Sequence, residues 1–335
     1  MGRPTIVIAH FEGFSALDET ALDRLDTIGE LLDRKPLHSW DEPRAQELLG
    51  SAEVIVGHWG CPLFGPAFFG AATNLRLFAY AAGSVKWYLS DELWERNILV
   101  TTCADANAEP VAEYTLAMIL LANKGVFPAI DRESHRTAWT PPADSAAHGN
   151  WDKTIGLVSV SLTGRRVAQL LQPFDHLRVQ IYDPYVDAET IEALGATKQE
   201  SLVDLCAQAD VLSIHAPALP DTHNLIGETE LAALRNGTTV INTSRGHCLD
   251  LDALTAELES QRLFGIIDVT DPVEPLPPTH PLRTLPNAVL TPHVAGSQGT
   301  ELARLGESVI DEVERYAKGE PLRNPVTREM VDRIA

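Results

Sequence analysis

Short apolar runs alternate with longer amphipathic segments along almost the whole chain. The runs are typical of strands buried on both faces, whereas the segments between them carry apolar residues at helical spacing. The runs predict strands at residues 5–9, 53–57, 75–81, 98–102, 155–160, 178–182, 211–215, 238–243, 264–269 and 288–291. Such alternation of strands and helices indicates parallel sheets covered by helices on both faces.

The amphipathic segments predict helices, and two of these carry signals at their ends. Segment 110–123 is apolar on nearly every side and is expected to be buried, with Pro110 in its first turn. Segment 301–318 is expected to end at Gly319, which is a suitable C-cap. The other predicted helices lie at 17–32, 91–95, 165–171 and 252–263.

Length and composition narrow the class of protein. A chain of 335 residues favours two domains, and the loop composition of 140–150 separates two α/β units. The formal charge of −21 argues against binding to nucleic acid or to an acidic membrane. No apolar stretch approaches the ~20 residues of a membrane span, and the first apolar run is too short for a signal peptide. Four scattered cysteines predict reduced thiols in the cytoplasm and no metal site.

A dinucleotide-binding turn is expected at residues 157–164, which read LVSVSLTG. An apolar run precedes this segment and a helical stretch follows it, and the strand about twenty residues later ends in Asp183. This layout is that of the G-x-G-x-x-G fingerprint. Ser159 and Ser161 stand at the first two glycine positions, whereas Gly164 keeps the third.

The two serines alter the turn, but dinucleotide binding is still expected. Ser159 must form the turn without glycine's freedom, at a cost of about 1 kcal/mol if its φ is positive. Ser161 adds a side chain where phosphate approaches, although its hydroxyl can donate a hydrogen bond to that phosphate. The following helix N-terminus remains available for the pyrophosphate. Asp183 predicts NAD rather than NADP, because a carboxylate accepts from ribose hydroxyls and repels a 2′-phosphate.

Polar residues follow several strands at the edge where ligands of open parallel sheets bind. Arg245 follows the predicted strand 238–243, Glu274 lies after 264–269, and His293 lies after 288–291. A solitary histidine there would more often be structural. An arginine, an acid and a histidine together instead indicate a catalytic site.

Three sequence blocks make this interpretation more specific: NTSRG at 242–246, the segment from Asp268 to Glu274 with the following PLP, and TPHVAG at 291–296. They resemble the signature blocks of the D-isomer-specific 2-hydroxyacid dehydrogenases. Supporting matches are HAP at 215–217, Asn107 with VAE at 111–113, and GEPLRNPV at 319–326. The resemblance runs from about residue 50 to residue 326, with the blocks in family order.

The resemblance implies an α/β fold with two Rossmann-like/flavodoxin-like parallel-sheet domains. An NAD-binding domain (109–294) would be inserted into a substrate domain (1–108 and 295–335). It further implies a homodimer that interconverts a 2-oxoacid and a D-2-hydroxyacid with NAD(H). By motif position, Arg245 would bind the substrate carboxylate, His293 would be the general acid/base, and Glu274 would be its partner.

The remaining candidate residues fall into two groups. The expected cofactor-binding residues are Ser159, Ser161, Leu162, Thr163, Gly164, Asp183, His215, Ala216, Pro217, Thr222, Thr243, Ser244, Asp268 and His293. The expected substrate-binding residues are Gly83, Ser84, Lys86, Trp59 and Arg245. Segment 139–150 is the candidate dimerisation arm.

Several alternatives stay open at this point. The spacing from Asp268 to Glu274 is one residue longer than the family pattern, so Asp271 competes for the acid role. Lys86 replaces a family aspartate and either adds charge near the substrate or is a solvated lysine, and Trp59 either lines the substrate pocket or packs in the core. For the whole chain, the alternative to an enzyme is a non-catalytic dinucleotide-binding or regulatory protein that retains the dehydrogenase fold.

Overall fold

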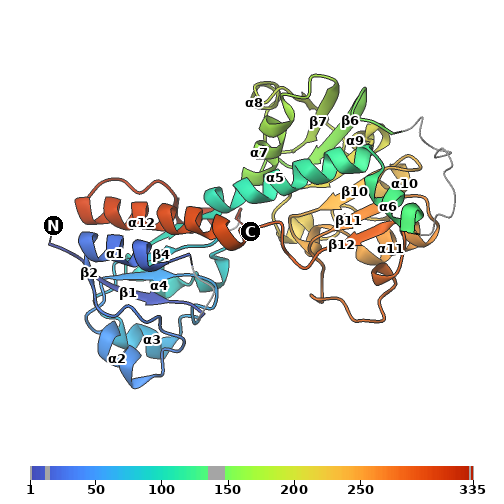
Figure 1. Cartoon of the computed structure of the whole chain (residues 1–335). Coiled ribbons are helices and arrows are strands. Elements are labelled where there is room, and N and C mark those ends of the chain that lie inside the picture. The colour runs from blue at the N-terminus through green and yellow to red at the C-terminus, as the bar shows by residue number, and fades with distance from the viewer. Residues whose placement is uncertain (1, 12–15, 135–147, 332, 335) are drawn as a thin grey trace. The chain divides into compact units, whose positions relative to one another are not determined.

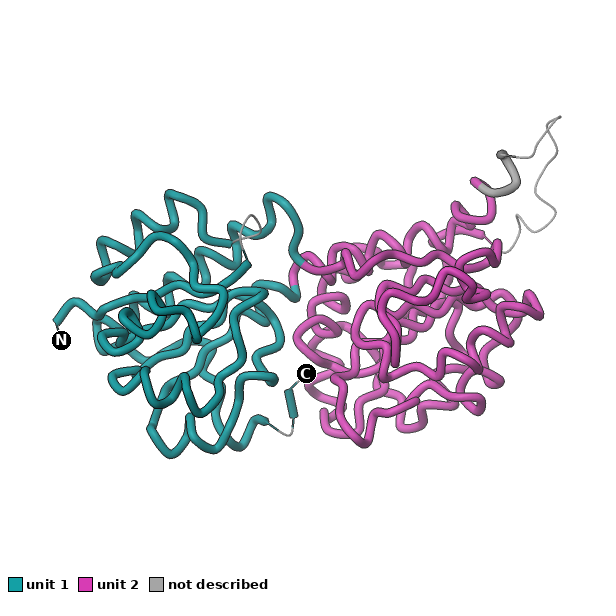
Figure 2. Tube along the Cα trace, turned by 90° about the horizontal axis from the view of Figure 1, so that it is seen from below, with its two compact units in different colours: residues 1–108, 297–335 teal, residues 109–296 magenta. Residues whose placement is uncertain are grey.

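The computed structural model describes residues 2–11, 16–134, 148–331 and 333–334. The chain forms two compact units, coloured separately in Figure 2: unit 1 comprises 1–108 and 297–335, and unit 2 comprises 109–296. Unit 2 is therefore inserted into the sequence of unit 1. The expected pair of parallel-sheet α/β domains is confirmed. The returning segment of unit 1 begins at Ser297, whereas the sequence predicted residue 295.

Unit 1 is built on a six-stranded sheet in the order β13-β5-β4-β3-β1-β2. Its strands are parallel except β13, which pairs antiparallel with β5. The strands are β1 (Thr5–Ala9), β2 (Glu30–Leu31), β3 (Val54–Gly57), β4 (Leu77–Tyr80), β5 (Leu99–Thr102) and β13 (Pro325–Val326). The helices are α1 (Glu19–Ile28), α2 (Pro43–Leu49), α3 (Pro66–Ala71), α4 (Asp91–Glu95) and α12 (Leu302–Lys318).

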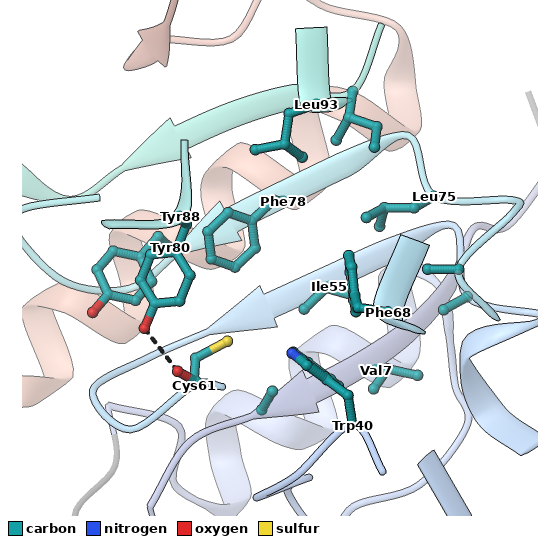
Figure 3. Packing of buried hydrophobic residues seen from close by; sticks show 14 of the residues in the cluster. Val7, Trp40, Ile55, Cys61, Phe68, Leu75, Phe78, Tyr80, Tyr88 and Leu93 are labelled. Carbon is teal, nitrogen blue, oxygen red and sulfur yellow. Dashed lines mark hydrogen bonds between the residues drawn. The ribbon is translucent and has the colours of Figure 1, made fainter. Parts of the chain in front are cut away.

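Alternate residues of the strands of unit 1 enter two separate cores. Ile6 and Ile8 of β1 point into a cluster shared with α1 and α12, which lie together over one face in Figure 1. Val7 points to the opposite face, where Figure 3 shows it in a cluster with Phe68 and Phe78. This period of two is what a sheet buried on both faces requires.

Unit 2 is built on a seven-stranded parallel sheet in the order β12-β11-β10-β9-β6-β7-β8. Its strands are β6 (Lys153–Val158), β7 (Leu177–Tyr182), β8 (Thr197–Lys198), β9 (Val211–Ile214), β10 (Thr239–Asn242), β11 (Phe264–Ile267) and β12 (Ala288–Leu290). Its helices include α6 (Val126–Ser134), α7 (Leu162–Leu171), α8 (Ala188–Glu192), α9 (Leu202–Gln208), α10 (Glu228–Ala233) and α11 (Leu251–Glu259). The chain passes from β6 to β7 on one side and later to β9 on the other. This reversal at β6 is where ligands of such sheets bind.

Helix α5 (Ala104–Asn123) corrects one expectation. The prediction that Pro110 lies in the first turn was wrong, because Pro110 lies inside the helix. The helical hydrogen bonds begin earlier, where the Asn107 amide donates to the Cys103 carbonyl at 2.9 Å. The Asn107 side chain also accepts a hydrogen bond from the Ser297 amide at 3.1 Å, which ties the helix start to the returning segment of unit 1.

The other predicted elements have their counterparts in the structure. Each of the ten predicted strands overlaps an observed strand, although most are shorter than expected. The last helix ends as predicted, since Gly319 has a φ of 70° and caps it in the left-handed conformation. The two-residue strands β2, β8 and β13 were not predicted, because two residues are too few to show a hydrophobic period.

We predict that Gly306→Ala destabilises unit 1. A methyl group on Gly306 of α12 would clash with the backbone carbonyl of Ala16, and such overpacking typically costs about 1–3 kcal/mol. The matched control is Gly50→Ala, because Gly50 has a right-handed backbone and no atom within 4 Å of an added methyl group. Thermal unfolding should show a lower midpoint for Gly306→Ala alone. Equal midpoints for the two variants would contradict the packing described for α12.

Candidate active site in unit 2

The expected dinucleotide turn joins β6 to α7. Ser159 leaves β6 with a φ of 81°, in the left-handed region that favours glycine. Ser161 is the N-cap of α7, and its hydroxyl accepts a hydrogen bond from the Gly164 amide at 3.2 Å. A methyl group on Gly164 would clash with the Ser159 carbonyl, so this glycine allows the helix to approach the turn closely. The turn thus has a left-handed residue at the first fingerprint position and a close helix approach at the third, despite its two serines.

The Asp183 carboxylate lies at the end of β7 and is 5% exposed. Its Oδ2 accepts hydrogen bonds from the Val160 amide at 2.8 Å and from the Ser159 hydroxyl at 3.1 Å. Its Oδ1 accepts from the Tyr185 amide at 2.9 Å. The acid expected to meet the ribose is therefore already bonded to the dinucleotide turn.

These residues fit a dinucleotide. Helix α7 has 10 residues, and the amides of a first helical turn have no acceptors within the helix, so they favour a pyrophosphate. Leu162 and Thr163 form the start of that turn, and the Leu162 side chain is exposed. The carboxylate of Asp183 lies beside the turn, where ribose hydroxyls would need an acceptor.

His215 follows β9 and packs beneath the turn. The imidazole is 2% exposed, and its Nε2 lies 3.0 Å from the Ser213 hydroxyl. Burial lowers the pKa of His215 to about 3, so the ring is neutral at physiological pH. Ala216 is also buried, and the Thr222 hydroxyl donates to the Pro217 carbonyl. These contacts give this segment a structural role around the expected cofactor site.

The loop that carries Arg245 is shaped by the buried side chain of Asn242 at the end of β10. Its Oδ1 accepts hydrogen bonds from the Ser244 amide and hydroxyl, and its Nδ2 donates to the Arg245 carbonyl at 3.0 Å. The Thr243 hydroxyl lies 2.9 Å from the Thr115 hydroxyl of α5. A methyl group on Gly246 would clash with the backbone of residues 270 and 271, so the Arg245 loop lies directly against the loop that leads to Glu274.

Most N–H donors of the Arg245 guanidinium have no hydrogen-bond partner among the described residues. Its Nη1 donates to the Ser244 carbonyl at 2.7 Å, and no carboxylate among the described residues lies within 4 Å of it. Burial lowers the pKa of Arg245 from its ordinary value, and the nearby Cys248 and Glu274 oppose that shift. A guanidinium remains protonated in proteins. A partly buried cation with unused donors suits an anionic ligand.

His293 is paired with Glu274 at a strand end. Its Nδ1 lies 2.7 Å from Glu274 Oε1, and the two side chains are 53% and 36% exposed. Glu274 Oε2 also accepts a hydrogen bond from the Thr270 amide at 3.3 Å. The structure thus places Glu274, and not Asp271, against the imidazole. Nδ1 is engaged by the carboxylate, which leaves Nε2 as the nitrogen that can exchange a proton with a ligand.

Asp268, at the end of β11, fixes the turn that carries His293. Its carboxylate is 2% exposed and accepts hydrogen bonds from the Thr291 hydroxyl at 2.6 Å, the Val294 amide at 2.9 Å and the Ala295 amide at 3.0 Å. The Asp268 carbonyl accepts the His293 amide at 3.0 Å. His293 itself has a φ of 56°, which few residues other than glycine adopt. In the structure Asp268 therefore acts as a positioning residue.

Two polar side chains of α5 were missed from the sequence. The Tyr114 hydroxyl lies 2.9 Å from the Thr291 hydroxyl, and Thr115 supports Thr243. Both belong to the segment that was expected to be buried through its apolarity. Polar residues at such buried positions need hydrogen-bond partners, and this signal could have pointed to them.

The expected substrate-binding residues of unit 1 lie at the ends of β3 and β4. Gly83 and Ser84 form the partly exposed loop after β4. Lys86 Nζ donates to the Ile334 carbonyl at 3.3 Å, so this lysine is held by the C-terminal segment. Trp59 packs against two hydrophobic clusters and lies edge-on to His58, with ring centroids 4.6 Å apart. Trp59 therefore packs against the core, and its contact with substrate stays a prediction.

Several other properties concern only the part of the chain that the structure describes. In that part, no group of three or more His, Cys, Asp or Glu side chains could hold a metal ion. No helix there is long and apolar enough to cross a membrane. The four cysteines are buried and form no disulfide.

Comparisons with known proteins show which family the chain is similar to. The sequence model of the D-isomer specific 2-hydroxyacid dehydrogenase, NAD binding domain, matches residues 116–295. Glyoxylate reductase from Aeropyrum pernix is 33% identical, over 70% of this chain and 71% of that protein. D-3-phosphoglycerate dehydrogenase from Methanocaldococcus jannaschii is 26% identical, over 92% of this chain and 58% of that protein. A crystal structure of the TT0316 protein from Thermus thermophilus superposes with a TM-score of 0.76 at 29% identity, covering 96% of this chain and 100% of that one.

The matches confirm the resemblance that the sequence blocks indicated, and they confirm NAD as the expected cofactor. They differ in how much of each relative is covered. The chain spans between 48% and 58% of the length of three D-3-phosphoglycerate dehydrogenases that it matches.

We predict that the buried His215 makes unit 2 sensitive to acid. Its folded pKa of about 3 lies below the ordinary value of 6.5, so between these values the unfolded chain binds a proton that the folded chain does not. Stability should therefore fall as pH decreases below 6.5, and His215 should account for about 2 kcal/mol at pH 5. Urea unfolding at pH 7 and pH 5 should show a smaller pH dependence for His215→Gln than for the parent. An unchanged dependence would contradict the assignment.

Proposed function

Because the chain belongs to the D-isomer-specific 2-hydroxyacid dehydrogenase family, we propose that it interconverts a 2-oxoacid and a D-2-hydroxyacid with NAD(H). The observation that carries this proposal is the His293–Glu274 pair. The loop that leads to Glu274 packs against the Arg245 loop at Gly246. A cation for the substrate and a proton donor thus lie on adjoining loops of unit 2.

Arg245 is proposed to bind the carboxylate and the neighbouring carbonyl oxygen of the 2-oxoacid. A guanidinium offers parallel N–H donors that match a carboxylate, and the donors of Arg245 are not used by a protein carboxylate among the described residues. Its partial burial strengthens the attraction, because water competes less for the ion pair. This local cation also draws an anion towards a chain whose formal charge is −21.

His293 is proposed to deliver the proton to the carbonyl oxygen during reduction and to remove it during oxidation. Glu274 accepts the Nδ1 hydrogen and fixes the ring, so that Nε2 carries the exchanged proton. The carboxylate also stabilises the positive charge of the protonated ring. Asp268 holds the turn beneath the ring, so the imidazole stays in one orientation.

NAD(H), when bound, supplies or accepts the hydride. The residues proposed to hold it are the start of α7 with Ser161 for the pyrophosphate and Asp183 for the adenosine ribose. Gly164 keeps the helix close to the turn. The contributions of Gly83, Ser84, Lys86 and Trp59 of unit 1 to substrate binding stay predictions.

A homodimer is also proposed, formed mainly through unit 2. It rests on the family resemblance, and the candidate arm at 139–150 falls largely outside the described residues. Light scattering at micromolar concentration should give twice the chain mass of 36.5 kDa, and a monomer would contradict the proposal. The cytoplasmic location expected from the cysteines stays a prediction.

The proposed activity is tested with a panel of 2-oxoacids and either NADH or NADPH, followed at the nicotinamide absorbance band. We expect at least one 2-oxoacid to be reduced, and NADH to be preferred because Asp183 repels a 2′-phosphate. If NADH binds but no 2-oxoacid is turned over, the alternative of a non-catalytic dinucleotide-binding protein becomes the better account. The left-handed Ser159 and the engaged Asp183 are the observations in favour of that alternative.

We predict that His293→Ala lowers kcat by about 10²-fold or more, the usual contribution of a positioned general acid. Arg245→Lys should chiefly raise KM for the 2-oxoacid, because an ammonium group cannot form the forked contact. The matched control is His176→Ala, since His176 is also partly exposed and lies 3.2 Å from a carboxylate, that of Asp175. Steady-state kinetics should give the same kcat and KM for His176→Ala as for the parent. An unaltered kcat in His293→Ala would show that the proton donor is misassigned.

A further inference from the structure

Ser159 does more than replace a glycine, because its hydroxyl bonds to the acid at the ribose site. Asp183 Oδ2 accepts the Ser159 hydroxyl at 3.1 Å and the Val160 amide at 2.8 Å, while Oδ1 accepts the Tyr185 amide at 2.9 Å. A carboxylate offers about four acceptor positions, two on each oxygen. Oδ2 is therefore fully occupied, and one position remains on Oδ1.

In dinucleotide domains the acid at this position hydrogen-bonds the 2′-hydroxyl of the adenosine ribose of NAD, and the 3′-hydroxyl is its neighbour on the same ring. We propose that the Ser159 hydroxyl competes with one ribose hydroxyl for Asp183 Oδ2 and thereby sets the affinity for NAD. To bind both ribose hydroxyls, the enzyme must first break the Ser159–Asp183 hydrogen bond. Ser159 is thus an affinity-determining residue that acts through Asp183. The inference deepens the proposed function and rests on it only for the identity of the cofactor.

The two backbone donors explain why removing the hydroxyl should help rather than harm. The Val160 and Tyr185 amides hold Asp183 from its two oxygens, so the carboxylate stays in place without Ser159. The acid is buried, so its remaining partners also keep its orientation fixed. Loss of the hydroxyl therefore frees one acceptor position and does not release the side chain.

The left-handed backbone gives a way to separate the hydroxyl from the conformation. Ser159 has a φ of 81°, which alanine adopts at a cost and glycine adopts freely. Ser159→Ala and Ser159→Gly both remove the hydroxyl, but only the alanine variant keeps the strain. If the hydroxyl controls affinity, both variants should change NADH binding in the same direction. The alanine variant should have a lower thermal stability than the glycine variant, because it keeps the strain.

The test measures NADH dissociation constants of the full chain by calorimetry, without any need for turnover. We expect Ser159→Gly and Ser159→Ala each to bind NADH about fivefold more tightly than the parent, the scale of one hydrogen bond. The same titrations use NAD and its two analogues that lack the 2′- or the 3′-hydroxyl of the adenosine ribose. At least one analogue should bind the Ser159 variants no more tightly than the parent, because it lacks the hydroxyl that would occupy Oδ2.

Ser161→Gly is the matched control in the same turn. Its hydroxyl accepts a hydrogen bond from the Gly164 amide and does not contact Asp183. Ser161→Gly should therefore change the dissociation constants of NAD and of its two analogues by the same factor. Weaker or unchanged NADH binding in either Ser159 variant would overturn the inference, as would a gain that both analogues retain. Absence of binding to parent and variants at millimolar NADH would overturn it as well. A chain that shows the expected affinities but reduces no 2-oxoacid would instead contradict the proposed function alone.

Discussion

The buried carboxylate of Asp268 is the contact on which the arrangement of the candidate site depends. A buried charge is tolerated only when its hydrogen-bonding capacity is satisfied, and Asp268 obtains that from the Thr291 hydroxyl and the Val294 and Ala295 amides. These donors all belong to the turn around His293. The need to satisfy the acid thus fixes the left-handed backbone of His293, which in turn brings its ring to Glu274.

A second buried carboxylate with satisfied hydrogen bonds lies at the end of β7. Asp183 is also buried and is satisfied by the Val160 and Tyr185 amides and the Ser159 hydroxyl, so it ties the dinucleotide turn to the neighbouring strand. In both places an acid after a strand organises the loop of an adjacent strand. One acid positions the proposed proton donor, and the other governs access of the ribose. Carboxylates therefore organise these two strand ends of unit 2.

The sequence predicted the strands well, because buried strands leave apolar runs. The polar residues that follow the strands marked Arg245, Glu274 and His293 as candidates, and their catalytic roles stay proposals. The sequence favoured Glu274 over Asp271 by the motif that follows Glu274, but it left Asp271 as a competitor because the contact to His293 depends on the path of an irregular loop. It also placed Pro110 at a helix start, although contacts of Asn107 begin the helix earlier. The Ser159–Asp183 bond was likewise not foreseen, because it joins residues of different strands that only the fold brings together.

The central claim is that Arg245, Glu274 and His293 of unit 2 form one active site. A crystal structure of the chain with NADH and oxamate, an unreactive analogue of a 2-oxoacid, tests it most directly. The account predicts the oxamate carboxylate on the Arg245 guanidinium and its carbonyl oxygen within about 2.6–3.2 Å of His293 Nε2, with Glu274 still paired to Nδ1. Oxamate bound away from Arg245, or with its carbonyl oxygen out of reach of His293, would contradict it.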